Sequence, residues 1–462
     1  MRPVRLLTAI LVLILAPRLA AAADPAAGRW NGTIQLPGGA APLVVSVVLE
    51  PAASAGAWQG TVDIPAQMAL GLRLDPVSVE GAKLRFAIQG VPGNPTFEGT
   101  LTGDEIRGTF TQGRTPMPFE LRRARRPQEP KPPFPYSSED VTYKNGDVTL
   151  AGTLTLPPGK GPFPAVLLLT GSGAQNRDEE LFGHKPFAVL ADHLTRAGIA
   201  VLRVDDRGVG GSTGGSPNPT TEDLAVDALA GVTFLKGRPQ IDPRRIGLLG
   251  HSEGGIVAPA AASRSDDVRF VILLAGTGVP GYDTLLRQIE HLNRTAGLPQ
   301  NVIDKNLAIQ RRVMDLVRDE KDEAALRSKV RAVFAAELTG APTAFIDSKV
   351  QEVLHPGFRA MVTHDPRPAL SKVKVPVLAL NGALDLQVDA DQNLPEIEKA
   401  LKEAGNKDVT VRRLPGLNHL FQTAKTGKLE EYGQIEETIS PEVLQLVTDW
   451  IVERFGKVPP RK

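Results

Sequence analysis

Helix-like and strand-like segments alternate along residues 163–276, and this alternation constrains the fold more than any other feature of the chain. It begins with the continuous apolar run "FPAVLLL" at 163–169, which is typical of a strand buried on both faces. The segments that follow are helix 186–198, strand 199–204, helix 220–237, strand 245–250, helix 253–263 and strand 268–276. Because parallel strands need crossover connections, the pattern predicts an α/β domain with a mostly parallel sheet covered on both faces.

This α/β domain is expected to cover residues 136–462, after a charged, proline-dense linker at 125–135 that cannot form a helix or a central strand. Strand signals stop at about residues 281–368, where segments such as "DTLLRQIEHLNRTAG" predict helices. The alternation then resumes with strand 375–382, helix 392–404, strand 409–416 and helix 440–456. We expect the insertion to form a helical cap, and the loops at the carboxyl ends of the strands to carry the chemistry.

A different pattern fills residues 24–124, where short alternating strands are separated by glycine, proline and asparagine. This spacing predicts a small all-β domain, either a lipocalin-like barrel or a sandwich. An apolar-x-Gly-Thr phrase recurs in it at 30–33, 58–61, 97–100 and 106–109, and glycine inside a strand often marks a bulge or a barrel corner. Trp30 and Trp58 either face a ligand or fill the core, and recurrence of the phrase at 150–153 favours ordinary strand packing.

Residues 1–23 have the pattern of a secretory signal peptide, with Arg2 and Arg5, an apolar core at 6–16 and an alanine-rich end. The apolar core is shorter than the roughly 20 residues that a membrane-spanning helix needs. We therefore expect a secreted or periplasmic protein with no stable membrane anchor after cleavage, the alternative being a retained anchor.

Composition excludes several kinds of site. The chain has no cysteine, which rules out disulfides, thiolate catalysis and cysteine metal sites. Its 53 basic and 52 acidic residues give a net charge of +1, without the broad positive field that attracts nucleic acid. We expect no nucleic-acid partner, no metal and no cofactor.

The pattern G-x-S-x-G occurs twice, at 210–214 and 250–254. Ser252 directly follows a strand and directly precedes a helix, so its flanking glycines permit a cramped turn that lifts its hydroxyl off the sheet. Ser212 lies inside a longer glycine-rich loop, and no helix begins until about Thr220. The sequence therefore predicts Ser252 as a nucleophile and Ser212 as a loop residue.

A nucleophilic serine needs a neutral imidazole to accept its proton and a carboxylate to orient that imidazole. On a strand–turn–helix nucleophile of this kind, the order along the chain is serine, acid, histidine. Of the seven histidines, three precede Ser252 and three lie in the insertion, which leaves His419 as the base. Asp385, just past strand 375–382, is predicted as the acid, whereas Asp389 is interpreted as a helix N-terminal residue or a surface charge.

The negative oxygen of a tetrahedral intermediate needs two preorganised hydrogen-bond donors. The backbone N–H of Glu253, after the nucleophile, is predicted as one of them. The second is assigned to Ser172, in the glycine-rich loop after the first long parallel strand. Four charged residues of nearby loops, Arg177, Asp178, Asp206 and Arg207, are interpreted as structural, with substrate binding as the alternative for Arg177 and Asp178.

Five phrases in order carry a family resemblance: "TGSGAQNRD", "VLRVDDRGVGGSTG", "GHSEGG", "LNGALDLQV" and "GLNHLFQ". Over about residues 136–458 the chain resembles exported serine hydrolases of the α/β-hydrolase superfamily, which look like carboxylesterases and are often grouped with serine aminopeptidase-like hydrolases. The resemblance implies a triad of Ser252, Asp385 and His419. It does not fix the substrate, because relatives of this kind split esters, thioesters or short peptides.

The sequence thus predicts a cofactor-free carboxylesterase that acts on small-molecule esters through an acyl-enzyme. Two alternatives remain open. One is an exported serine peptidase, aminopeptidase or prolyl-peptidase-like, on the same triad. The other is a ligand-binding protein in which the all-β domain binds the ligand and the hydrolase domain is inactive.

Overall fold

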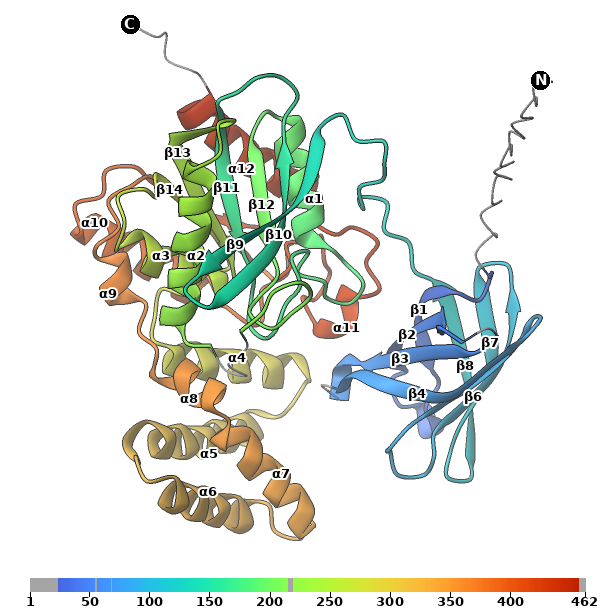
Figure 1. The fold of residues 1–462 in the computed structure, drawn as a ribbon. Helices are drawn as coiled ribbons and strands as arrows, with labels where there is room; N and C mark the ends of the chain where they lie inside the picture. Colours follow the sequence, from blue (N-terminus) through green and yellow to red (C-terminus); the bar gives the residue numbers. More distant parts are fainter. Residues whose placement is uncertain (1–23, 55, 68, 215–218, 457–462) are drawn as a thin grey trace, which may run out of the picture. The chain divides into compact units, whose positions relative to one another are not determined.

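The computed structural model describes residues 24–54, 56–67, 69–214 and 219–456. The predicted signal peptide, residues 1–23, lies outside the described residues. Contacts divide the chain into two compact units: the residues up to Arg123, apart from 65–68, form the first, and the residues from Ala124 onward belong to the second. The first unit is all-β and the second is α/β (Figure 1), so both predicted fold classes are confirmed in the predicted order.

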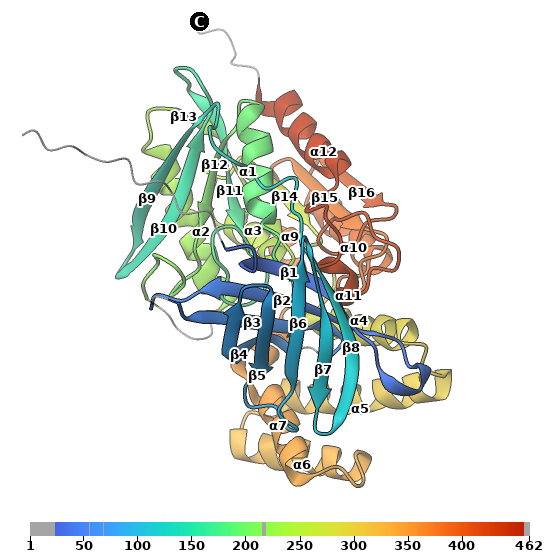
Figure 2. The same cartoon turned by 90° about the vertical axis from the view of Figure 1, so that its right-hand side faces the viewer.

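The first unit is a closed antiparallel barrel (Figure 2). Its strands are β1 (Gly28–Ile34), β2 (Leu43–Pro51), β3 (Trp58–Ile64), β4 (Ala69–Glu80), β5 (Lys83–Ile88), β6 (Thr96–Thr102), β7 (Glu105–Gln112) and β8 (Thr115–Arg123). Each strand pairs with its neighbour in the sequence, and β1 pairs with β8 to close the ring. Of the two predicted architectures, the structure therefore has the barrel.

Side chains fill the interior of this barrel. Trp30 is fully buried, and its indole Nε1–H donates to the carbonyl oxygen of Ala26 at 3.0 Å. Phe86 and Phe97 stack with ring centroids 4.7 Å apart, within a buried cluster to which every strand of the barrel contributes. Trp58 is partly buried and packs against the same cluster. The two tryptophans thus pack in the core, in agreement with the packing interpretation.

The glycines of the repeated phrase lie where neighbouring strands approach closely. A Cβ atom built on Gly32 would lie 1.9 Å from the carbonyl oxygen of Glu120, and one on Gly108 would lie 2.0 Å from that of Glu98. Strand pairing is in register at both glycines, and the register shifts in this barrel occur elsewhere, in β3 and β4. The expected bulges are therefore not at Gly32 and Gly108, and glycine is needed there for lack of space.

The second unit is built on a sheet with the order β16-β15-β14-β13-β11-β12-β10-β9 (Figure 1). Its strands are β9 (Ser137–Asn145), β10 (Val148–Leu156), β11 (Phe163–Leu169), β12 (Ala200–Val204), β13 (Ile241–His251), β14 (Phe270–Leu274), β15 (Val377–Gly382) and β16 (Val409–Leu414). Strands β11 to β16 run parallel, whereas β9 and β10 are antiparallel. Strand β9 was not predicted from the sequence, because this edge strand is mostly polar and buries few side chains.

Helices cover both faces of the sheet. One face packs against α1 (Pro186–Arg196) and α12 (Pro441–Ile451), and the other against α2 (Thr221–Lys236), α3 (Gly254–Ala262) and α10 (Ala390–Glu403). The short helices α9 (Arg367–Leu370) and α11 (Leu429–Tyr432) lie in connections. Helix α2 begins as predicted, because Thr220 and Asp223 form a reciprocal capping box.

The predicted helical insertion follows β14. It consists of α4 (Gly281–Thr295), α5 (Gln300–Asp319), α6 (Glu323–Glu337), α7 (Thr343–Leu354) and α8 (Pro356–Thr363). These helices bury a hydrophobic cluster of their own around Val313, Met314 and Val330. Within the described ranges, no helix combines the length and the apolar character needed to cross a membrane.

The predicted linker segment contains no helix or strand, but it is fixed to the second unit. The side-chain oxygen of Gln128 accepts the N–H groups of Thr438 and Ile439, at 2.6 and 3.1 Å. Its amide nitrogen donates to the carbonyl oxygen of Ile439 at 2.7 Å. A proline-dense segment has few N–H groups for a strand, so side chains make its attachments instead.

Candidate active site

Ser252 occupies a sharp turn between β13, in the middle of the sheet, and α3. Its φ of 52° lies in the left-handed region, which residues other than glycine rarely adopt and which often marks functional sites. A Cβ atom on Gly250 would lie 1.9 Å from the carbonyl oxygen of Gly254, and one on Gly254 would lie 2.1 Å from that of Leu169. Only glycines fit at these positions, so the predicted cramped turn at Ser252 is present.

Ser212 has a different environment. It is buried, and its hydroxyl donates to the carbonyl oxygen of Asp205 at 2.8 Å and accepts the N–H of Ala151 at 2.9 Å. Because these hydrogen bonds use the hydroxyl as donor and acceptor, Ser212 holds its loop against β10. This agrees with its interpretation as a loop residue.

The structure brings His419 and Asp385 together. Asp385 follows β15, His419 follows β16, and Nδ1 of the imidazole lies 2.8 Å from Oδ2 of the carboxylate. Both residues are buried, with 5% and 3% of their surface exposed. The other carboxylate oxygen accepts the N–H groups of Gln387 and Val388 at 2.8 and 2.9 Å, which fixes the orientation of Asp385. A proton on Nδ1 can donate to this carboxylate, an arrangement in which Nε2 is the acceptor nitrogen of the imidazole.

Asp389 is engaged elsewhere. Its carboxylate caps α10 through the N–H of Gln392 at 2.7 Å, and it pairs with Arg287 and His291 of α4 at 3.1 and 3.0 Å. Burial favours the neutral acid, but these hydrogen bonds and positive charges outweigh it and hold the pKa of Asp389 far below its usual range. Of the two interpretations of Asp389, a helix N-terminal residue or a surface charge, the structure has the first, and the ion pairs of Asp389 tie α4 of the insertion to α10.

Two backbone N–H groups beside Ser252 lack partners in the part of the chain that the structure describes. Neither the Ser172 N–H nor the Glu253 N–H donates a hydrogen bond to a described residue. A Cβ atom built on Gly171 would lie 3.4 Å from Cβ of Ser252, so the loop that holds Ser172 adjoins the nucleophile.

Burial raises the pKa of the Glu253 carboxyl, although a hydrogen bond from the Ser172 side chain partly opposes the shift.

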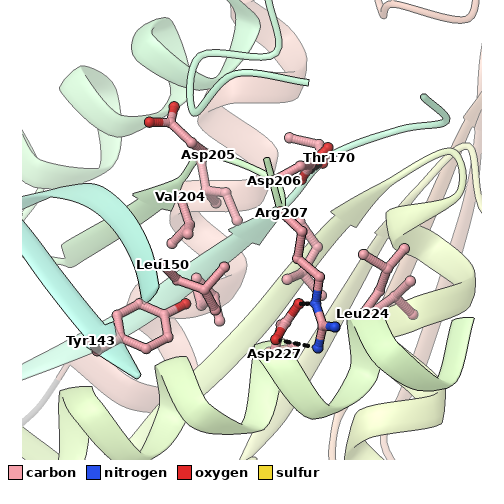
Figure 3. A pocket seen from close by; sticks show the side chains of 14 residues that line it. Tyr143, Leu150, Thr170, Val204, Asp205, Asp206, Arg207, Leu224 and Asp227 are labelled. Carbon is pink, nitrogen blue, oxygen red and sulfur yellow. Dashed lines mark hydrogen bonds and ion pairs between the residues drawn. The ribbon is translucent and has the colours of Figure 1, made fainter. Parts of the chain in front are cut away.

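The charged residues of the neighbouring loops form ion pairs. The pairs are Arg177 with Asp205, Asp178 with Arg203, and Arg207 with Asp227 on α2 (Figure 3). Each pair joins two segments that are distant in the sequence. The structural interpretation of these residues agrees with the contacts, since Arg177 and Asp178 each pair with a residue of the β12 region.

Asp206, which lines a small pocket with Thr170 (Figure 3), has a raised pKa. Its carboxylate accepts the hydroxyl of Thr170 and the N–H of Gln175, both at 2.8 Å. Burial nevertheless raises the pKa of Asp206 to about 6, because these two hydrogen bonds only partly compensate for lost hydration.

We expect Asp206→Asn to remove a pH dependence of stability. Since the folded-state pKa of Asp206 exceeds the unfolded value of 3.8, the folded chain binds more protons between those two values, and its stability falls as the pH rises through them. Relative to the variant, the native protein should lose at most about 3 kcal/mol of unfolding free energy between pH 4 and pH 7. Urea unfolding of both proteins measures this. A stability difference that is the same at both pH values would contradict it.

Two buried residues of the site had no role in the sequence analysis. Nδ1 of His251 lies 2.9 Å from Oε1 of Glu179, and its Nε2 lies 3.0 Å from the carbonyl oxygen of His419. His251 precedes Ser252 in the chain, so the order serine, acid, histidine predicts no catalytic role for it. Glu179 belongs to no motif, and its 72-residue separation from His251 hides the contact from local pattern analysis.

Comparison with known proteins supports the α/β-hydrolase assignment. The sequence profile of the family described as serine aminopeptidase, S33, matches residues 185–423, just over half of the chain. Esterase EstD of Thermotoga maritima is 28% identical over 353 residues, which cover 76% of this chain and 74% of that protein. The thiohydrolase apmlB of Arthrinium phaeospermum is 33% identical over 147 residues, which cover 31% of this chain and 44% of that protein.

Among solved structures, the Pyrococcus furiosus esterase Pf2001 superposes on 72% of this chain and 97% of its own, with a TM-score of 0.44 and 17% identity. The span that matches the family profile includes Ser252, Asp385 and His419. The chain therefore belongs to the serine aminopeptidase S33 family of α/β-hydrolase serine hydrolases.

Proposed function

We propose that this protein hydrolyses carboxylic esters with Ser252 as nucleophile, His419 as base and Asp385 as the acid that orients it. The observation that carries the proposal is the 2.8 Å contact between Nδ1 of His419 and the buried carboxylate of Asp385. It supports His419 as a base because the contact leaves the Nε2 lone pair available to accept a proton. The strained turn at Ser252 supports its role as nucleophile.

In the proposed reaction, Nε2 of His419 takes the hydroxyl proton of Ser252 while Oγ bonds to the carbonyl carbon of the ester. The bond to the alcohol then breaks, and His419 returns the proton to the leaving oxygen. Water, deprotonated by the same imidazole, adds to the acyl-enzyme. The acid leaves as the proton returns to Oγ, and Asp385 stabilises the imidazolium that forms in both halves of the reaction.

The backbone N–H groups of Glu253 and Ser172 are the donors that we assign to the oxyanion. The support is that neither N–H donates to a described residue, while the loop of Ser172 adjoins Ser252. Donors fixed in this way do not reorganise during the reaction, and each is worth about 3 to 4 kcal/mol of transition-state stabilisation.

Ester substrates are proposed over peptides because the relative that matches three quarters of this chain is named an esterase. The family description, serine aminopeptidase, makes a peptidase the second candidate. The test compares kcat/KM for p-nitrophenyl acyl esters with kcat/KM for aminoacyl and prolyl p-nitroanilides, each divided by the spontaneous hydrolysis rate. Greater acceleration of the esters is expected, and greater acceleration of the anilides would assign the peptidase activity instead.

We also propose export, on the strength of the sequence of residues 1–23. Expression in a Gram-negative bacterium with a C-terminal tag should give a periplasmic chain that begins near Asp24. A full-length chain in the cytoplasm would contradict this proposal.

A further inference from the structure

We propose that Glu179 and His251 form a second histidine–carboxylate pair, which positions the catalytic base and the loop of the proposed oxyanion donor Ser172. The inference rests on the proposed roles of Ser252 and His419. His251 is the last residue of β13 and directly precedes Ser252, whereas Glu179 lies in the loop after β11. The pair therefore lies next to the turn of Ser252, and it contacts the loop that holds Ser172 and the loop that holds His419.

The hydrogen bonds that the pair makes with other residues go to backbone atoms, and the ring of His251 also lies against the ring of His419, with centroids 4.9 Å apart. Nε2 of His251 lies 3.0 Å from the carbonyl oxygen of His419, and Oε1 of Glu179 accepts the N–H of Gly171 at 2.6 Å. The two members of the pair meet at 2.9 Å between Nδ1 and Oε1. His419 is thus held twice, by Asp385 at its ring and by His251 at its main chain.

Hydrogen-bond chemistry fixes where the protons of the pair lie. A carbonyl oxygen can only accept, so the contact with His419 requires a proton on Nε2 of His251. The contact between Nδ1 and Oε1 then requires a second proton between them, since a bare nitrogen and a carboxylate would repel each other. His251 and Glu179 therefore share one proton beyond the Nε2–H and are neutral overall, so they do not oppose the positive charge that forms on His419.

Burial makes an uncompensated charge on Glu179 energetically costly. Glu179 is 1% exposed, and its Oε2 has no hydrogen-bond partner in the described part of the chain, so the carboxylate depends on His251 for charge compensation. Burial lowers the pKa of His251, but the charge and hydrogen bond of Glu179, the carbonyl of His419 and the charge of Asp385 together raise it. Glu179 also has a φ of 51°, a strained conformation that the surrounding loop must hold.

The substitution Glu179→Gln tests the pair with little change in shape. Its amide oxygen can still accept the Gly171 N–H, but it brings no negative charge to hold a second proton on the imidazole. The imidazole then has one proton for two acceptors, so either the contact with His419 or the contact with residue 179 is lost. His251→Asn removes the imidazole and keeps only an amide N–H near the position of Nδ1, so the contact of Nε2 with His419 is lost.

The experiment measures inactivation by a fluorophosphonate, which bonds to Oγ of the nucleophilic serine as fluoride leaves. In Glu179→Gln and His251→Asn, kinact should fall by about 100-fold, since misplacing catalytic groups by about 1 Å has this effect, while the inhibitor constant KI stays unchanged. Because the two residues act as one unit, the double variant should be no slower than the slower single variant. A folded variant with native kinact, a loss confined to KI, or losses that multiply in the double variant would overturn the proposal.

The matched control is His291→Phe, which removes both ring nitrogens from another histidine–carboxylate pair, with Asp389 at 3.0 Å. Its kinact should match that of the native protein, and an equal loss in this control would show that the effect of the other variants is not specific. Complete absence of labelling in the native protein would instead contradict the proposed function.

Nitrogen NMR of the native protein labelled at histidine tests the pair without any variant that could fail to fold. At pH 7 we expect a proton on Nε2 of His251, and a bare Nε2 would overturn the proposal.

Discussion

Ser252→Ala should lower ester turnover by about 10⁶-fold, the scale on which removal of the serine from a serine, histidine and acid triad acts. Ser252 is the only group that we propose to bond covalently to the substrate. Without its Oγ atom no acyl-enzyme forms, so only the effects of binding and of the oxyanion donors remain. The measurement is kcat for a p-nitrophenyl ester, corrected for spontaneous hydrolysis.

The chain provides a matched control for this substitution in Ser212, the serine of the other G-x-S-x-G pattern. Ser212→Ala removes two buried hydrogen bonds, to Asp205 and from Ala151. It should lower stability by about 1 to 3 kcal/mol and leave turnover by the folded protein nearly unchanged. Equal turnover by Ser252→Ala and native protein would contradict the assignment of the nucleophile.

Asp385→Asn should lower kcat by about 10⁴-fold, because an amide reverses the polarity of the contact with His419. The side-chain oxygen of asparagine can still accept the N–H groups of Gln387 and Val388, which leaves its NH₂ group facing Nδ1 of the imidazole. An amide that donates to Nδ1 holds the proton of the neutral ring on Nε2. The ring then cannot accept a proton from Ser252.

The matched control for this variant is Asp389→Asn, four residues further along. Asparagine also caps helices well, so the start of α10 should survive. The variant loses charge pairing with Arg287 and His291, and we expect a lower stability with kcat close to the native value. A larger loss of kcat in Asp389→Asn than in Asp385→Asn would contradict the assignment of the acid.

Local sequence patterns predicted much of the catalytic domain because strand ends and chain order place its polar residues. Asp385 and His419 each follow a buried parallel strand, and such strands end at one edge of the sheet. For the first unit, the sequence predicted strands but left the choice between barrel and sandwich open. Alternating residues predict strands, but the choice between barrel and sandwich depends on whether β1 pairs with β8, about 90 residues away, and local alternation does not encode that pairing.

The Glu179–His251 pair could not be predicted for a related reason. Its function depends on burial and on contacts with the backbone of Gly171 and His419, which any residue could provide. A glutamate in a loop and a histidine before a serine are each common in surface segments, so neither signals a buried ion pair. Only the folded structure shows that Glu179 and His251 are buried and in contact, unlike surface residues of the same types.

The most direct test of the central claim is to locate the covalent adduct on the native chain. After reaction with a fluorophosphonate, trypsin releases residues 246–264 as one peptide, which contains Ser252 and Ser263. Tandem mass spectrometry should place the phosphonyl group on Ser252. The absence of any adduct, or an adduct on another residue such as Ser212, would contradict the assignment of Ser252 as the nucleophile.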